Sequence, residues 1–151
     1  LPVHHLTKLH PEHCQKAPGC CEKVTNHNRW CYRAQSMATA RALMTALNLS
    51  PKNVTVSFQS RLGRRPWIEP YTDVVLPELV SSGVRKLLVS CPSFIADCLE
   101  TLEEIQIRLR EQFLELGGQD LKLVPALNAE DFWIQDFCQM VTRHNLHWWD
   151  G

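Results

Sequence analysis

Two glutamates, Glu100 and Glu104, are the first residues in this sequence whose type and spacing could do chemistry. Residues four positions apart lie on the same face of a helix, so the two carboxylates would project side by side. Like charges at this spacing repel mildly, and a helix with a purely structural role gains nothing from that repulsion. We therefore interpret the pair as a candidate site for a cation.

A structural role for Glu100 competes with this interpretation. Asp97 followed three residues later by Glu100 has the form of a capping box, in which two residues exchange hydrogen bonds at the start of a helix. A glutamate in the first turn most often caps the helix or offsets its dipole. The position of Glu100 alone therefore favours capping, and the chemical interpretation depends on Glu104.

Four cysteines close together near the start of the chain are the second candidate site: Cys14, Cys20, Cys21 and Cys31. The surrounding segment has little apolar content, so a metal or a cross-link would have to hold it together. The spacing fits a [2Fe–2S] cluster and a structural zinc about equally. Two disulfides fit less well, because an intracellular enzyme rarely keeps them.

The elements that would position these groups alternate along the chain. Apolar periodicity and capping signals predict helices over 28–47, 73–82, 99–116 and 131–144, and short apolar runs predict strands over 54–59, 84–90 and 121–126. This alternation predicts an α/β fold with a parallel sheet flanked by helices. Ligands of such sheets bind beyond the carboxyl ends of the strands, where residues 91–100 and the long mixed loop 57–73 lie.

The composition limits the class of partner. The chain has 151 residues, of which 44% are hydrophobic, and this is enough for one domain with a core. Its formal net charge is zero, so there is no electrostatic case for binding nucleic acid. No apolar run approaches the roughly 20 residues of a membrane-spanning helix. We expect an irregular Cys/His-rich segment over 1–27, an α/β domain over 28–144 and a tail over 145–151.

Three blocks of the sequence resemble the ferrochelatase family. They cover residues 57–63, 66–73 and 91–105, and the shorter blocks 32–35 and 125–128 add to the match. The chain is similar to the carboxyl-terminal half of a bacterial enzyme of the protoporphyrin type. The resemblance implies a chelatase-like fold with a Rossmann-like parallel sheet flanked by helices, one of two similar halves of the full enzyme.

The resemblance implies a reaction and a role for each candidate residue. Ferrochelatases insert Fe²⁺, their metal substrate, into protoporphyrin IX in the last step of heme synthesis. The metal-site glutamate of the family falls on Glu100, and its acidic partner falls on Glu104. The candidates for porphyrin binding lie in the long loop: Gln59, Ser60, Arg61, Trp67 and Tyr71.

Some microbial ferrochelatases carry a [2Fe–2S] cluster on internal cysteines close to the block 32–35. The resemblance therefore favours this cluster over zinc at the four cysteines, with a structural or sensing role. It also implies a location in the cytoplasm, with peripheral contact to the inner membrane.

The resemblance finally implies what this chain would lack. The metal-site histidine of the family lies just before a glycine that precedes a Leu-Pro pair, which here is Leu1-Pro2. We therefore expect the amino-terminal half of the same polypeptide to be a partner, and the chain alone to be inactive. The alternatives are a chelatase for another metal or tetrapyrrole, and a non-catalytic iron–sulfur or zinc module.

Overall fold

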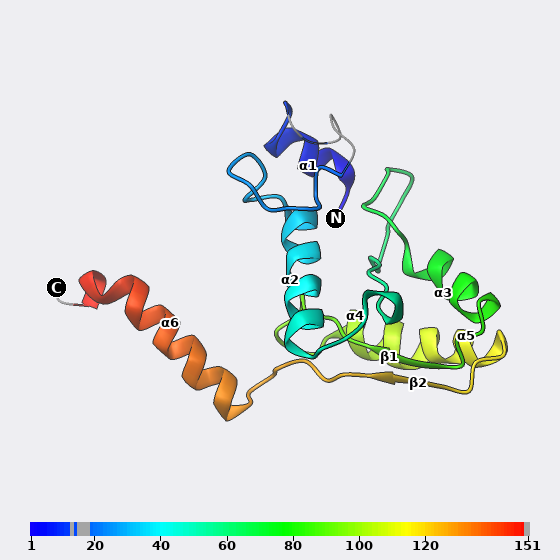
Figure 1. The fold of residues 1–151 in the computed structure, drawn as a ribbon. Coiled ribbons are helices and arrows are strands. Elements are labelled where there is room, and N and C mark those ends of the chain that lie inside the picture. Colours follow the sequence, from blue (N-terminus) through cyan, green and yellow to red (C-terminus); the bar gives the residue numbers. More distant parts are fainter. Residues whose placement is uncertain (13, 15–18, 150–151) are drawn as a thin grey trace.

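The structure is a computed structural model that describes residues 1–12, 14 and 19–149 (Figure 1). Its helices are α1 (Val3–Leu9), α2 (Tyr32–Ala46), α3 (Thr72–Ser81), α4 (Leu99–Thr101), α5 (Arg110–Glu115) and α6 (Asp131–Trp149). A 3₁₀ turn η1 (Pro51–Asn53), a π-helix η2 (Leu102–Leu109) and the strands β1 (Lys86–Val89) and β2 (Asp120–Leu123) complete the described elements. Helices and a small parallel sheet confirm the predicted α/β class.

The sheet consists of β1 and β2, which pair in parallel with Leu87 opposite Leu121. Parallel strands need a long crossover, and here the crossover is the continuous helical run α4, η2 and α5. Within this run η2 and α5 pack on β2, and α3 packs on α5 (Figure 1). Their buried side chains form the larger core of the molecule: Leu76, Val80, Ile105, Leu109, Phe113 and Leu121.

The middle of the crossover is a π-helix, which the sequence did not predict. The run over 99–115 matches the expected helix, but the eight residues of η2 have the wider π form. Its buried residues, Ile105 and Leu109, point into the core, and Glu104 lies beside them. π-Helical stretches are rare and occur frequently at functional sites. The presence of η2 therefore indicates a functional site in this part of the crossover.

The expected strand over 54–59 is wrong. This segment forms no ladder with β1 or β2 and makes only one isolated parallel bridge, from Phe58 to Tyr71. Its backbone hydrogen bonds go to the far side of the long loop instead, where Phe58 N donates to the Pro70 carbonyl and Thr72 N donates to the Phe58 carbonyl. The sheet therefore has two strands in the described part of the chain, and not the three expected.

The two ends of the chain also differ from expectation. The amino-terminal segment was expected to be irregular, but it contains α1, whose Leu6 is buried in a second, smaller core. The apolar side chain of Leu6 had a tertiary partner that its short sequence context could not reveal. The predicted last helix is confirmed and continues to Trp149, into the segment expected to be a tail.

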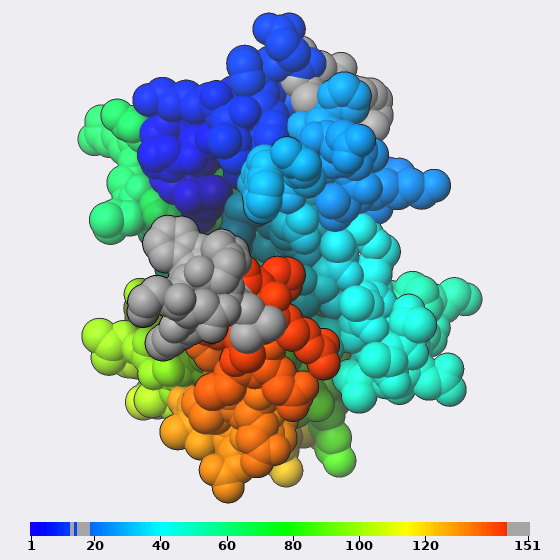
Figure 2. Space-filling model, turned by 90° about the vertical axis from the view of Figure 1, so that its left-hand side faces the viewer, coloured from blue at the N-terminus to red at the C-terminus, as the bar shows by residue number. Residues whose placement is uncertain are grey.

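The helix α6 extends away from the sheet in Figure 1, and Figure 2 shows it below the amino-terminal segment on one face of the molecule. Its amphipathic pattern leaves Phe132, Ile134, Phe137 and Met140 exposed. Across the ranges given above, no helix has both the length and the apolar content needed to cross a membrane.

Candidate functional site

A cavity of about 270 Å³ lies between the first part of the long loop, the start of α3 and the π-helix η2. It is lined by Phe58, Gln59, Ser60, Arg61, Tyr71, Asp73, Glu104 and Arg108. The structure thus brings together five of the predicted site residues: Gln59, Ser60, Arg61, Tyr71 and Glu104. Glu100 and Trp67 do not line this cavity.

Glu104 is held in a fixed orientation within the cavity. One oxygen of its carboxylate, Oε2, accepts hydrogen bonds from Gln59 Nε2 at 2.9 Å and from Ser60 Oγ at 2.5 Å. Arg108 Nη2 lies 3.8 Å from the other oxygen, Oε1. Ser60 adopts the left-handed conformation, with φ of 63°, which is uncommon for a residue other than glycine. Such strain persists where the surroundings fix it, and here the bond to Glu104 is one of the contacts that do so.

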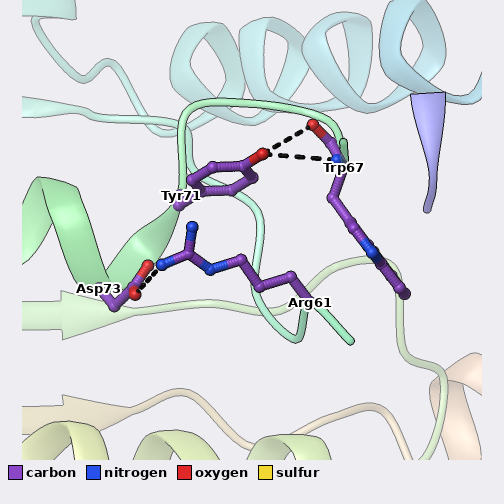
Figure 3. A network of polar contacts seen from close by, with 4 residues as sticks. All are labelled: Arg61, Trp67, Tyr71 and Asp73. Atoms are coloured by element: carbon purple, nitrogen blue, oxygen red, sulfur yellow. Dashed lines mark hydrogen bonds and ion pairs between the residues drawn. The ribbon is translucent and has the colours of Figure 1, made fainter. Parts of the chain in front are cut away.

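Arg61 lies between a carboxylate and an aromatic ring (Figure 3). Its Nη2 is 2.5 Å from Asp73 Oδ2, and its guanidinium carbon is 4.3 Å from the centre of the Tyr71 ring. Arg61 and Asp73 are about half exposed, so their ion pair contributes at most about 1 kcal/mol to stability. The guanidinium therefore remains available to an anionic ligand in the cavity.

Trp67 holds the far end of the same loop. Its indole Nε1 donates to the Leu62 carbonyl at 3.0 Å, and its own carbonyl accepts a hydrogen bond from the Tyr71 hydroxyl at 3.2 Å. The indole points away from the guanidinium of Arg61 in Figure 3. Trp67 thus shapes the loop without lining the cavity.

Glu100 lies in the first turn of α4, one turn before Glu104 along the same helical run. A hydrogen bond from the Cys98 thiol and one from its own backbone N–H lower the pKa of Glu100, against the smaller effect of desolvation. The carboxylate is therefore ionised at neutral pH.

The expected capping box between Asp97 and Glu100 is wrong. The Cys98 backbone N–H donates to Thr101 Oγ1 at 3.0 Å, so Thr101 takes the capping role. Glu100 takes no part in this capping box, although its carboxylate still accepts a hydrogen bond from its own backbone N–H in the first turn of α4.

Asp97 instead connects the loops that follow the two strands. Its carboxylate accepts hydrogen bonds from Asn128 Nδ2 at 2.8 Å, Thr101 Oγ1 at 3.0 Å and Ala126 N at 3.3 Å. Asn128 Oδ1 in return accepts from the Asp97 backbone N–H at 2.9 Å. This network fixes the residues that lead into Glu100. The sequence analysis missed it because Ala126 and Asn128 lie 29 and 31 residues away.

Because of these hydrogen bonds to Asp97, we expect the wild-type protein to lose stability in acid. The variant Asp97→Asn should lose less stability over the same pH range. The hydrogen bond from Asn128, followed by those from Thr101 and Ala126, lowers the pKa of Asp97 below its ordinary value of 3.8. A lowered pKa stabilises the fold above the unfolded value, and this contribution is lost as the pH falls through the folded value. We expect the unfolding free energy of the wild type to fall more steeply below pH 3.8 than that of the variant.

Chemical denaturation at pH 7, 5, 4 and 3 measures this difference. Asp136→Asn, which changes an exposed carboxylate on α6, serves as the control and should follow the wild type. Parallel pH profiles for the wild type and Asp97→Asn would refute the assigned role of the network.

The second candidate site is the cysteine cluster, by which we mean Cys14, Cys20, Cys21 and Cys31. All four are free thiols. Cys14, Cys21 and Cys31 are buried together with Leu6, Ala34 and Ile68, and Cys20 packs against them. Burial raises the pKa of Cys14, and it raises the pKa of Cys21 to about 11, although Arg33 lowers both.

The cysteine cluster fits a thiolate-bound metal in the number and kind of its ligands. The sulfur atoms of Cys20 and Cys21 lie 3.6 Å apart. Two thiolates on one tetrahedral metal, each about 2.3 Å from it, are about 3.8 Å apart, so this pair could bind one metal atom. For residues 1–12, 14 and 19–149, however, no three His, Cys, Asp or Glu side chains already have a metal-binding arrangement. Binding would have to bring the sulfurs of Cys14 and Cys31 together with those of Cys20 and Cys21.

Comparison with known proteins places this geometry in context. The family model named Ferrochelatase matches residues 11–145. The ferrochelatase of Stutzerimonas stutzeri is 51% identical over 146 residues, which are 95% of this chain and 43% of that protein. The ferrochelatase of Coxiella burnetii is 48% identical over 147 residues, which are 95% of this chain and 41% of that protein. The chain thus spans about two-fifths of the length of the curated relatives it matches.

Proposed function

Because the chain belongs to the ferrochelatase family, we propose that it supplies the carboxyl-terminal part of an enzyme that inserts Fe²⁺ into protoporphyrin IX. The observation that carries this proposal is the cavity in which Glu104 meets Gln59, Ser60, Arg61 and Tyr71. A fixed carboxylate and a guanidinium on an aromatic ring lie within one concave surface. These are the groups that a cation and an anionic macrocycle would need.

The two carboxylates match the chemistry of metal insertion. As Fe²⁺ binds the four nitrogens of the macrocycle, two pyrrole N–H protons must leave, so the reaction needs a metal ligand and a proton acceptor. An ionised carboxylate can serve as either, and it holds Fe²⁺ loosely enough to release it. We assign the metal to Glu100, whose lowered pKa keeps it ionised, and the proton to Glu104.

The porphyrin would be recognised by its carboxylates and its flat ring. Arg61 can bind a propionate through its planar guanidinium, and Tyr71 holds that guanidinium from the other side. Gln59, Ser60 and Trp67 complete the proposed porphyrin surface. The cavity volume of about 270 Å³ is just below the range of small-molecule sites, roughly 300–1,000 Å³. The remaining contacts would come from an amino-terminal half, which we propose as the partner of this chain.

The decisive experiment joins this chain to the amino-terminal part of the S. stutzeri ferrochelatase that it does not match. Anaerobic assays with Fe²⁺ would follow the loss of protoporphyrin fluorescence for the chain alone and for the joined protein. We expect activity only in the joined protein. A folded joined protein that leaves protoporphyrin unmetallated, or that metallates it only with Co²⁺, would contradict the proposal.

We also propose that the cysteine cluster binds a [2Fe–2S] cluster. The support is the number of thiols, their shared burial and the 3.6 Å separation of the Cys20 and Cys21 sulfurs. When bound, such a cluster would cross-link Cys14, the pair Cys20-Cys21 and the start of α2. Metal insertion involves no net redox change, so its role would be structural or sensing.

Anaerobic purification tests the cluster directly. We expect a red-brown protein whose visible absorbance, iron and sulfide are all lost on Cys20→Ser. Cys138→Ser changes an exposed cysteine on α6 and should leave them unchanged. A colourless protein with one bound zinc would contradict the iron–sulfur assignment. The location in the cytoplasm, with peripheral contact to the inner membrane, stays a prediction.

A further inference from the structure

Asp73 lines the cavity next to the arginine that we assign to a porphyrin carboxylate. It lies in the first turn of α3, two residues after the N-cap residue Tyr71. Its Oδ2 is 2.5 Å from Arg61 Nη2, so the two side chains form an ion pair at the start of the helix (Figure 3). The guanidinium proposed to receive a carboxylate of the ligand is thus already bound to a carboxylate of the protein.

The geometry of a guanidinium makes these two carboxylates rivals. Arginine binds a carboxylate most strongly through two parallel N–H···O bonds along one edge of its planar group. One such edge consists of Nη1 and Nη2, and the other consists of Nε and Nη2. Both edges include Nη2, the nitrogen of Arg61 that Asp73 contacts. A ligand carboxylate must therefore share this nitrogen with Asp73 or displace it, and both cases bring two negative charges close together.

Arg61 has a second support that does not compete with a carboxylate. Its guanidinium carbon lies 4.3 Å from the centre of the Tyr71 ring, which stabilises a cation on its face. The Tyr71 hydroxyl donates to the Trp67 carbonyl at 3.2 Å, so the ring is held in place independently of Asp73 (Figure 3). Removing the charge of Asp73 should therefore free Arg61 for a ligand while the side chain stays in the cavity.

The charges that line the cavity balance one another. Arg61 and Arg108 are positive, and Asp73 and Glu104 are negative. Because Asp73 cancels the charge of its neighbour Arg61, it weakens the attraction of the cavity for an anionic ligand. Without the charge of Asp73, two positive groups would face one negative group, and a carboxylate would bind more tightly.

A weaker hold on carboxylates is useful in a reaction that takes place at the centre of the ring. The carboxylates of a porphyrin lie at its rim, and metal insertion leaves them unchanged. A bond from Arg61 to such a carboxylate is therefore equally strong in substrate and product. Binding of this uniform kind does not speed the chemical step, and it also retains the product.

We infer that Asp73 is a competing counter-ion for Arg61, which limits the affinity of the cavity for the carboxylates of both substrate and product. The inference rests on the proposed function for the identity of the ligand as a porphyrin. The competition itself follows from the contacts of Arg61 with Asp73 and Tyr71. Asp73 is thus a residue that sets specificity through repulsion.

The variant Asp73→Asn tests the competition, because its amide oxygen can still accept a hydrogen bond from Arg61 but carries no charge. Quenching of tryptophan fluorescence in the joined protein would give the Kd for protoporphyrin and for zinc protoporphyrin. We expect both Kd values to fall about fivefold, the upper end of the effect of an exposed charge pair. If Asp73 only oriented Arg61, both ligands would bind the variant more weakly, and this result would overturn the inference.

Three comparisons connect the gain in affinity to the charges. The dimethyl ester of protoporphyrin has no carboxylate, so Asp73→Asn should change its Kd less than twofold. In the Arg61→Ala background, Asp73→Asn should also change the Kd for protoporphyrin less than twofold. Asp131→Asn removes a carboxylate from the first turn of another helix, α6, and should bind as the wild type does. An equal gain with the ester, or without Arg61, would contradict the inference.

A second variant keeps the test available if Asp73→Asn does not fold. Asp73→Ser is also uncharged, and serine is well tolerated at the start of a helix. It should lower the Kd for protoporphyrin by a similar factor and leave that for the dimethyl ester unchanged. Equal binding of protoporphyrin to Asp73→Ser and the wild type would count against the competition.

Benzoate separates this inference from the proposed function, because it offers a carboxylate without a macrocycle. Its binding would be followed by the ¹⁵N NMR signal of the Arg61 side chain. If the wild type binds no porphyrin but the Asp73 variants bind benzoate about fivefold more tightly, the proposed function fails and the competition stands. If protoporphyrin binds equally to the wild type and the variants, the competition fails and the proposed function stands. No gain for either ligand would overturn the inference.

Discussion

Replacing Glu104 by glutamine should slow metal insertion by the joined protein by about 10²- to 10⁴-fold, the range expected for loss of a proton acceptor. The structure fixes this carboxylate with two donors, Gln59 and Ser60, so the amide of Glu104→Gln would fill the same space. The amide can neither take a pyrrole proton nor carry the negative charge. We therefore expect the loss in kcat, with little change in the KM for protoporphyrin. Initial rates at saturating Fe²⁺ measure it.

Two comparisons make the result specific. Glu111→Gln removes an exposed carboxylate from the first turn of α5 and should retain wild-type activity. Glu100→Gln should raise the KM for Fe²⁺ as well as lower kcat, because we assign the metal to Glu100. A Glu104→Gln enzyme with more than a tenth of the wild-type kcat would show that the proton leaves by another route.

The sequence contained the signal for this site but not its surroundings. The unfavourable spacing of Glu100 and Glu104 is visible in a single helix, since it needs no tertiary information. The donors that hold Glu104 lie 44 and 45 residues away, so only the fold brings them to it. Phe58, Asp73 and Arg108 also line the cavity, and they were missed. Arg108 could have been found, because it lies one turn beyond Glu104 on the same face.

The expected capping box shows that a local pattern can predict the start of a helix correctly and still name the wrong capping residue. A cap was expected near residue 98, and one exists, but Thr101 forms it and Glu100 does not. Asp97 had stronger partners in Ala126 and Asn128, which follow the other strand. Within the local sequence Asp97 binds Thr101 and not Glu100, and the fold adds two distant partners, Ala126 and Asn128. The choice between local and distant hydrogen-bond partners of Asp97 depends on the folded structure, so the sequence alone does not predict it.

Element existence was predicted better than element pairing, and 54–59 is the clearest case. Its alternating pattern is typical of a half-buried strand, and Val54 at its start does have an extended backbone, with φ of −128° and ψ of 127°. Its backbone groups bind the returning arm of its own loop, near Pro70 and Thr72, and not the edge of β1. A strand pattern specifies which side chains are buried and leaves the pairing partner open. The sheet was therefore overestimated by one strand.

Replacing Phe113 by alanine should cost about 3–5 kcal/mol of unfolding free energy, the range for deleting a buried aromatic ring. Phe113 is 0% exposed and lies in the larger core with Ile105, Leu109 and Leu121. Gly118 closes over it so tightly that an added Cβ there would be 2.4 Å from the Phe113 ring. The backbone therefore cannot easily collapse into the space that the ring leaves, which favours the upper part of the range.

The loss of core packing should also affect the candidate site. Ile105 and Leu109 anchor η2 on this core, and Glu104 lies beside them in the same helix. Denaturant unfolding of Phe113→Ala should show the loss, whereas Phe113→Leu should cost about 1–2 kcal/mol because it keeps most of the volume. Phe132→Ala, at a residue that is 60% exposed on α6, should change stability by less than about 0.5 kcal/mol. If Phe113→Ala cost no more than Phe132→Ala, η2 would have to be anchored elsewhere, and Glu104 would not owe its position to this core.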